Sequence, residues 1–302
     1  MGQLTMIYDC IIIGGGVAGL QASIQLGRYM RKVAVIDAEE GRSTLCQKYN
    51  NILGFPHGVS GHTLRQAGEE HARRLGVHFY NDAVRHLHKN GATFEACGQL
   101  NIKGRKVLLA TGVKDHIPTI KGVEPCLGLS IYVCPDCDGY EIKGKKTVVM
   151  GSGDTGAALA VILTYWSSRI TFINHDQKPL SKKMLEKLQA SQVALKETEI
   201  CEVKEENGQI QAVETVEDGI IEAEKAFVAF GGNIVRSDLA AQLGAQVREN
   251  KHLIVDPQTK MTTVEGLWAA GDAVAHSELV TAAMGEASIA ALWVHKSLLK
   301  EE

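Results

Sequence analysis

Two copies of one glycine-rich pattern constrain this chain more than any other feature. The pattern Gly-x-Gly-x-x-Gly begins at residue 14 and again at residue 151. Each copy follows an apolar run of strand length, residues 9–13 and 147–150, and precedes a helical stretch and a second apolar run. Strand, glycine turn, helix and strand form the unit from which parallel sheets are built. The sequence therefore predicts an α/β fold with two Rossmann-like nucleotide-binding domains.

The first copy has the parts of a complete dinucleotide site. Its glycines are Gly14, Gly16 and Gly19, and Asp37 stands 18 residues after the last of them, where the second strand ends. Glycine permits the tight turn and the approach of backbone amides to a pyrophosphate, and the acid can accept from a ribose hydroxyl. These residues predict binding of the ADP half of a dinucleotide. The alternative is a glycine-rich turn that binds nothing.

The second copy, Gly151, Gly153 and Gly156, lacks a clear acid. The position that corresponds to the acid of the first copy is Asn174, and Asp176 follows two residues later. A nicotinamide nucleotide is the expected ligand, since the strand and the helix are both present. A vestigial site that keeps only the fold is the alternative.

A pair of cysteines, Cys134 and Cys137, lies shortly before the second copy. Two thiols at this spacing can close a disulfide, and a thiolate formed there can attack a disulfide in another molecule. Asp138 follows directly, either as a turn residue or as a general acid and base for the thiols. Half of a zinc site is the alternative for the pair, but the other cysteines are scattered singly and no histidine pair lies beside them.

Composition excludes several classes of function. The net charge is −3 and aromatic residues make up 5%, so nothing favours nucleic-acid binding. No apolar run is long enough to span a membrane, and we expect no signal peptide before the first strand. Seven cysteines, an odd number, argue against a framework of structural disulfides. We therefore expect a cytoplasmic enzyme without a metal and without nucleic-acid or membrane partners.

Five motifs occur in a recognisable order. They are the first glycine fingerprint, Ala110-Thr111-Gly112, the stretch from Cys134 to Gly139, the second fingerprint, and Ala270-Gly271-Asp272. This order resembles that of the low-molecular-weight, bacterial-type thioredoxin reductases, a family of FAD-dependent disulfide oxidoreductases. The dithiol just before the second fingerprint is the most specific element, and the resemblance covers nearly the whole chain.

The resemblance implies that one domain is inserted into the other. Residues 1–114 and 236–302 would form a discontinuous FAD-binding domain. Residues 115–235 would form an NAD(P)-binding-like domain that carries the redox pair. Members of the family are homodimers, so a homodimer is expected here.

The resemblance also implies roles for single residues. Cys137 would face the flavin, and Cys134 would exchange with the disulfide of the partner. The nicotinamide nucleotide would contact Gly151, Gly153 and Gly156. The residues implied for FAD are Gly14, Gly16, Gly19, Asp37, Asn51, Thr111, Gly112, Gly271 and Asp272.

The chain departs from the family pattern in two places. NADPH-specific members carry His-Arg-Arg after the second-domain strand, where this chain has Asn174-His175-Asp176. The Arg-Gln that follows the late Gly-Asp in the family is also missing, and the region reads Glu278-Leu279-Val280. The choice between NADH and NADPH, and the electron donor itself, therefore stay open at this point.

The leading interpretation is an enzyme that passes electrons through FAD and the Cys134–Cys137 pair to a thioredoxin-like protein disulfide. One alternative is a dithiol oxidase, which would close a disulfide in a small dithiol and pass the electrons to O₂. Another is a thioredoxin reductase that takes its electrons from ferredoxin. A redox-sensing flavoprotein without turnover is the alternative from a different class.

Overall fold

The computed structural model describes residues 6–274 and 278–302. The chain divides into two compact units, and each is described by itself. Unit 1 comprises Met1–Thr44, Ser60–Lys114 and Ile234–Glu302. Unit 2 comprises Leu45–Val59 and Asp115–Asn233.

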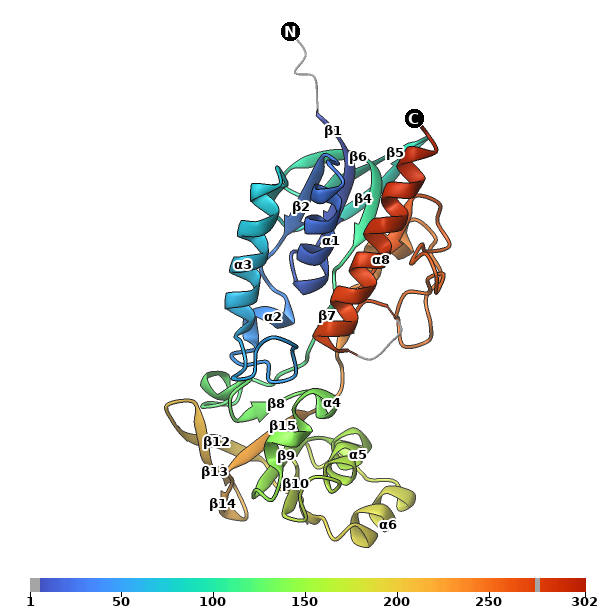
Figure 1. The fold of residues 1–302 in the computed structure, drawn as a ribbon. Coiled ribbons are helices and arrows are strands. Elements are labelled where there is room, and N and C mark those ends of the chain that lie inside the picture. The colour runs from blue at the N-terminus through green and yellow to red at the C-terminus, as the bar shows by residue number, and fades with distance from the viewer. Residues whose placement is uncertain (1–5, 275–277) are drawn as a thin grey trace. The chain divides into compact units, whose positions relative to one another are not determined.

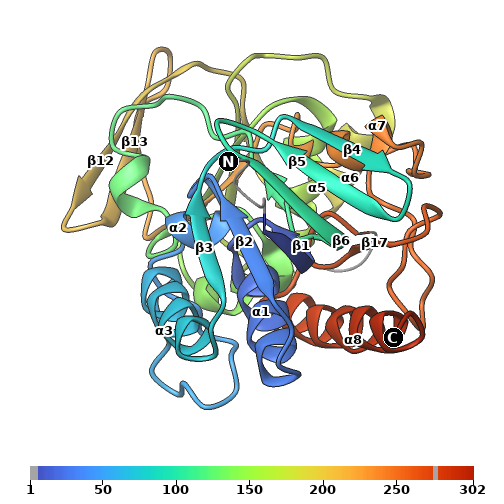
Figure 2. The same ribbon diagram turned by 90° about the horizontal axis from the view of Figure 1, so that it is seen from above.

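Unit 1 is built on a sheet whose central strands are parallel. In the described part of the chain, seven strands pair in the order β3-β2-β1-β6-β5-β4, with β17 beside β6. Figure 1 labels the strands β1, β2, β4, β5 and β6, and Figure 2 labels β3 and β17 as well. Strands β1, β2, β3, β6 and β17 pair in parallel, whereas β4 and β5 run antiparallel. The strands are β1 (Ile7–Ile13), β2 (Val33–Asp37), β3 (His78–Asn81), β4 (His86–Asn90), β5 (Thr93–Cys97), β6 (Asn101–Leu109) and β17 (Leu267–Ala269).

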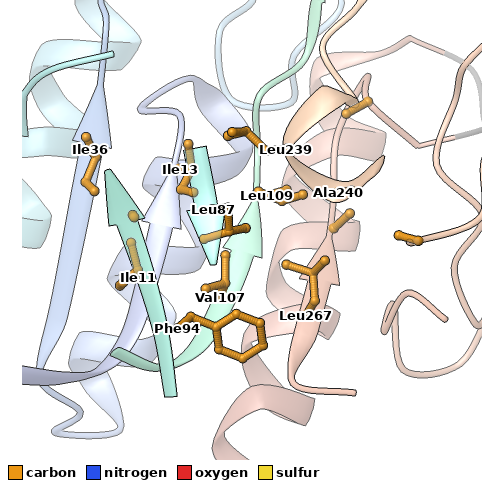
Figure 3. Packing of buried hydrophobic residues seen from close by; sticks show 14 of the residues in the cluster. Ile11, Ile13, Ile36, Leu87, Phe94, Val107, Leu109, Leu239, Ala240 and Leu267 are labelled. Atoms are coloured by element: carbon orange, nitrogen blue, oxygen red, sulfur yellow. The ribbon is translucent and has the colours of Figure 1, made fainter. Parts of the chain in front are cut away.

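Strand β1 is buried on both faces, as its apolar sequence requires in a parallel sheet. Ile11 and Ile13 point into one hydrophobic cluster, which also holds Phe94 of β5 (Figure 3). Cys10 and Ile12 point into the cluster on the opposite face. Alternate side chains of a strand face opposite sides, so one strand serves two cores.

Three helices cover the face that holds Ile12 (Figure 2). They are α1 (Val17–Arg28), α3 (Gly61–Arg74) and α8 (Val280–Leu299), and α1 contacts both of the others. Small buried side chains on α8, such as Ala287 and Ala291, let it pack closely. Unit 1 also contains α2 (Arg42–Leu45, whose last residue belongs to unit 2), β7 (Val113–Lys114), β16 (Ile234–Val235) and α7 (Asp238–Gln242).

Unit 2 is built on an all-parallel sheet with the order β11-β10-β9-β15-β8. A separate antiparallel meander, β12-β13-β14, turns at Asn207-Gly208 and at Asp218-Gly219, as its turn residues predict. The elements are η1 (Glu124–Cys126), β8 (Ile131–Tyr132), α4 (Pro135–Asp138), η2 (Gly139–Ile142), β9 (Thr147–Gly151), α5 (Gly153–Leu163), β10 (Ile170–Asn174), α6 (Lys182–Ala190), β11 (Ala194–Lys196), β12 (Ile200–Glu206), β13 (Gln209–Thr215), β14 (Gly219–Glu222) and β15 (Lys225–Ala229).

The predicted α/β fold with two Rossmann-like units is confirmed, because each glycine pattern joins a parallel strand to a helix. The sequence pattern did not indicate the antiparallel strands β4 and β5. In β4 only Leu87 is buried and the flanking histidines are exposed, so the apolar signal is weak. In the described part of the chain, no helix has both the length and the apolarity that a membrane span needs.

Two glycine-to-alanine changes should have opposite effects on stability. A Cβ at Gly19 would lie 1.9 Å from the carbonyl oxygen of Gly14, so Gly19→Ala must displace backbone. We expect the free energy of unfolding to fall by about 1–3 kcal/mol, from overpacking. Gly285, exposed in α8, has no atom near its Cβ position, and Gly285→Ala should raise stability by about 0.5–1 kcal/mol. Denaturant unfolding of the FAD-free protein measures both, and a Gly19→Ala variant as stable as wild type would contradict this packing.

Candidate active site

The first glycine turn brings backbone and acid together at the carboxyl edge of the unit 1 sheet. Gly14 has a φ of 104°, and a Cβ there would lie 2.3 Å from the carbonyl oxygen of Ala110. A Cβ at Gly15 would lie 2.8 Å from the carboxyl carbon of Asp37, so this acid sits against the turn. Gly16 caps α1 without a side-chain bond, and no acid occupies the first helical turn. The helix N-terminus is therefore suited to an anionic ligand.

An arginine that the sequence pattern did not reveal completes this turn. Arg65 of α3 donates from Nη2 to Oδ2 of Asp37 at 2.7 Å and from Nη1 to the carbonyl oxygen of Gly15 at 2.9 Å. It thus adds positive charge beside the helix N-terminus. No local motif marks it, because only the packing of α3 beside α1 brings it there.

The other predicted residues of unit 1 come from loops after β6 and β17, which are parallel neighbours and end at one edge. Thr111 donates from its hydroxyl to the carbonyl oxygen of Arg236 at 2.5 Å, and Gly112 has a φ of 67°. A Cβ at Gly271 would lie 2.9 Å from the Cβ of Ala18, so this loop touches the start of α1.

Asp272, next in the chain, is already paired with a cation. Arg42 of α2 donates from Nη1 to Oδ2 of Asp272 at 3.1 Å and also bonds Glu278. Asn51 is exposed and lies in the segment that groups with unit 2. The glycine turn, the open helix N-terminus, Asp37 and Arg65 together fit the pyrophosphate and ribose of a dinucleotide such as FAD.

The two cysteines of unit 2 are joined as a disulfide, with Cα atoms 5.3 Å apart. Cys134 is the N-cap of the short helix α4, and Pro135 starts that helix, where its fixed φ suits the first position. The backbone N–H of Cys137 donates to Sγ of Cys134 at 3.2 Å. The same bond would stabilise a thiolate at Cys134 after reduction, because a hydrogen bond to the charged form favours it.

Asp138 ends α4 in an environment that changes its acidity. Burial, and then the negative charge of Glu141, raise the pKa of Asp138 to about 7, while Lys225 acts in the opposite direction. Burial likewise lowers the pKa of Lys225, whose Nζ donates to the carbonyl oxygen of Leu129 at 2.8 Å and to the hydroxyl of Tyr132 at 3.1 Å. A carboxyl group with a pKa near 7 can both give and take a proton beside the thiols.

The remaining cysteines are free thiols in the structure: Cys10, Cys46, Cys97, Cys126 and Cys201. Burial raises the pKa of the Cys46 thiol to about 11, which makes it a poor nucleophile. In the described part of the chain, no cluster of three or more His, Cys, Asp or Glu side chains is placed to hold a metal ion.

The second glycine turn packs against backbone and side-chain atoms of unit 2. A Cβ at Gly151 would lie 2.6 Å from the carbonyl oxygen of Ala229, and one at Gly156 would lie 2.5 Å from the ring of Phe172. Helix α5 begins at Gly153, one motif position earlier than α1 begins in unit 1. The glycines thus serve close packing between strand and helix in both units.

Comparisons with known proteins agree with this geometry. A family model described as pyridine nucleotide-disulphide oxidoreductase matches residues 8–287. The chain is 28% identical over 295 residues to a thioredoxin reductase of Mycolicibacterium smegmatis, with 94% of each chain covered. It is 29% identical over 299 residues to a thioredoxin reductase of Bacillus subtilis (strain 168), with 94% of this chain and 93% of that one covered. The crystal structure of HlmI is similar with a TM-score of 0.88 and 26% identity, covering 99% of this chain and 96% of the other.

The family match includes both glycine turns, the dithiol and the loop at Gly271, so it covers every part of the site described above. It extends over most of the chain rather than over one Rossmann unit, of which many unrelated proteins have a copy. The chain therefore belongs to the pyridine nucleotide-disulphide oxidoreductase family, as an FAD-dependent disulfide oxidoreductase of the thioredoxin reductase-like type.

Proposed function

We propose that this enzyme reduces the disulfide of a thioredoxin-like protein by thiol–disulfide exchange at Cys134 and Cys137. The observation that carries the proposal is the bonded Cys134–Cys137 pair beside Asp138, whose pKa lies near 7. The choice of partner is supported by relatives named thioredoxin reductase that align along nearly the whole chain.

The proposed cofactor arrangement follows the two glycine turns. FAD binds the domain formed by residues 1–114 and 236–302, with its ADP half on the turn at Gly14, Gly16 and Gly19. The inserted domain, residues 115–235, carries the dithiol and the second turn. Asn51, Thr111, Gly112, Gly271 and Asp272 are proposed as the further FAD contacts. Bound FAD would supply the electron pair that reduces the Cys134–Cys137 disulfide.

The exchange proceeds in two displacements. The thiolate of Cys134 attacks one sulfur of the partner disulfide, so a Cys134–partner bond forms and the partner's own S–S bond breaks. The thiolate of Cys137 then attacks Sγ of Cys134. This closes the Cys134–Cys137 bond and releases, as a thiolate, the partner sulfur that was bonded to Cys134. Two electrons pass from the dithiol to the partner. Asp138 removes a proton from a thiol or supplies one to a leaving thiolate.

The enzyme is proposed to act as a homodimer in the cytoplasm. Support for this location comes from the cysteines, since five of the seven are free thiols and the remaining two form the working pair. That usage is typical of a reducing compartment, where disulfides are transient and catalytic. Support for the dimer comes from the family resemblance.

The FAD assignment predicts one noncovalent FAD per subunit. Asp37→Ala should lower the affinity for FAD about tenfold or more, because a charged hydrogen-bond partner is lost at the ribose. Flavin released by heat, identified by chromatography and titrated back by fluorescence, measures both stoichiometry and affinity. Asp218→Ala, which removes an acid of a hairpin turn in unit 2, is the control and should keep wild-type affinity. FMN in the released fraction, or a colourless protein that refuses FAD, would contradict the assignment.

The dithiol predicts a sharp separation between turnover and flavin binding. Cys134→Ser should reduce the rate of protein-disulfide reduction at least about a hundredfold, because the nucleophile is lost. The flavin spectrum should be retained. The matched control is Cys201→Ser, which changes an exposed thiol of the meander and should leave turnover unchanged. Turnover in Cys134→Ser equal to wild type would remove the pair from the mechanism.

The raised pKa of Asp138 predicts a pH dependence of the exchange centred near pH 7. In the wild type the rate of thiol exchange should change around pH 7, and Asp138→Asn should be slower and lack that inflection. The control is Asp136→Asn, an exposed acid on the same helix with the same change of charge. If the dependence of the exchange rate on pH is the same in Asp138→Asn as in the wild type, Asp138 serves only as a turn residue.

Stability provides a second readout for Asp138. The pKa rises from 3.8 to about 7 on folding, so the protonated carboxyl stabilises the fold fully below pH 3.8 and this contribution is lost as the pH rises through about 7. The free energy of unfolding of Asp138→Asn relative to wild type should therefore increase by about 1–3 kcal/mol between pH 4 and pH 8. Denaturant unfolding of the oxidised protein across this range measures it.

A further inference from the structure

We propose that Asp176 accepts hydrogen bonds from the adenosine ribose hydroxyls of a nicotinamide dinucleotide bound to unit 2, and that it thereby selects NADH over NADPH. This inference rests on the proposed function, since it names the electron donor of the same enzyme. In dinucleotide-binding units an acid near the end of the second strand accepts from the ribose hydroxyls, and it lies beside the glycine turn. The structure shows which residue of unit 2 occupies that place.

Asn174, the residue that corresponds to Asp37 by position, is not available for this role. It pairs with Gly151 in the strand register and is completely buried. Its Oδ1 accepts from the backbone N–H of Gly153 at 2.9 Å, and its Nδ2 donates to the carbonyl oxygen of Lys178 at 2.9 Å. Both ends of the amide thus hold the loop after β10 onto the glycine turn.

Asp176 reaches the turn from two residues further along the chain. The backbone N–H of His175 donates to the carbonyl oxygen of Gly151 at 2.9 Å, which places the next residue, Asp176, beside the turn. Lys178, whose Nζ lies 3.1 Å from Oδ2 of Asp176, holds the pKa of this carboxyl below its usual value, so the side chain is ionised at neutral pH. Ser152 is the residue between the first two glycines of its motif, as Gly15 is in unit 1, where Asp37 lies against it. Each acid thus lies close to its own glycine turn, and the side chain of Asp176 is 40% exposed.

The charges around Asp176 disfavour a 2′-phosphate. The sequence has no arginine from residue 170 to residue 200. Lys178 Nζ lies 3.1 Å from Oδ2 of Asp176, so this cation is already paired with the carboxylate. The ring of His175 is held by Ile200, whose backbone N–H donates to Nδ1 at 2.8 Å, and by an edge-on contact with Phe230, while Nε2 lies 4.0 Å from Oδ1 of Asp176. A dianionic phosphate at this edge would meet the carboxylate of Asp176 without a bidentate partner.

Nucleotide affinity tests the inference without relying on turnover. The FAD-loaded enzyme is titrated by calorimetry with NAD⁺ and with NADP⁺, which differ only in the 2′-phosphate. We expect the wild type to bind NAD⁺ at least about tenfold more tightly. In Asp176→Ala the affinity for NAD⁺ should fall about tenfold and that for NADP⁺ should not, so the preference should disappear. Asp176→Asn keeps the side-chain size and should lose the preference too, which covers the case of an unstable alanine variant.

Two further variants sharpen the test. Lys178→Ala leaves the carboxylate in place and removes its neighbouring cation, so the preference for NAD⁺ should grow. Asp218→Ala removes a surface acid elsewhere in unit 2 and should change neither affinity. Equal or tighter binding of NADP⁺ by wild type, binding of neither nucleotide, or an unchanged preference in both Asp176 variants would each overturn the inference.

The outcome can be separated from that of the proposed function. Disulfide reduction is measured in parallel with enzyme that has been reduced chemically, without any nucleotide. Intact exchange together with failed nucleotide discrimination would overturn only the role of Asp176. Lost exchange with intact discrimination would overturn only the proposed function.

Discussion

The close approach of backbone to backbone at the two glycine turns is the constraint on which the rest of the structure depends. In unit 1 the first glycine meets the carbonyl oxygen of Ala110, and in unit 2 Gly151 meets that of Ala229. In both units the third glycine of the motif lets the helix pack directly against the first glycine. Any side chain at these places would separate helix from strand, and the helix N-terminus would no longer lie at the sheet edge where phosphates bind.

The chemistry of the dithiol depends on a different kind of environment. Cys134 caps the short helix that contains Cys137, so local geometry alone brings the two sulfur atoms together. The acidity of Asp138 cannot arise locally, because it comes from burial and from Glu141 and Lys225 around it. Lys225 belongs to β15, far along the chain. The pair is thus a local motif whose proton chemistry is set by the fold of unit 2.

The two units use one motif in different ways. In unit 1 the acid at the strand end faces the turn and is paired with Arg65. In unit 2 the corresponding position is a buried amide that holds a loop in place, and Asp176, two residues later, follows the residue whose backbone N–H bonds the first glycine of the turn. In both units the spacing from the last glycine of the motif identified the strand end at which the acid should lie. It could not choose between Asn174 and Asp176, because that choice depends on how the loop folds back.

The sequence by itself determined the two βαβ units, the hairpin turns at Asn207 and Asp218, and the dithiol, because each depends on residues that are close in the chain. Glycine patterns, strand periodicity and a two-residue gap between cysteines express local geometry directly. Only the tertiary structure decided the role of Arg65, the internal bonds of Asn174 and the raised pKa of Asp138. These depend on burial and on partners far away in the sequence, for which no local pattern exists.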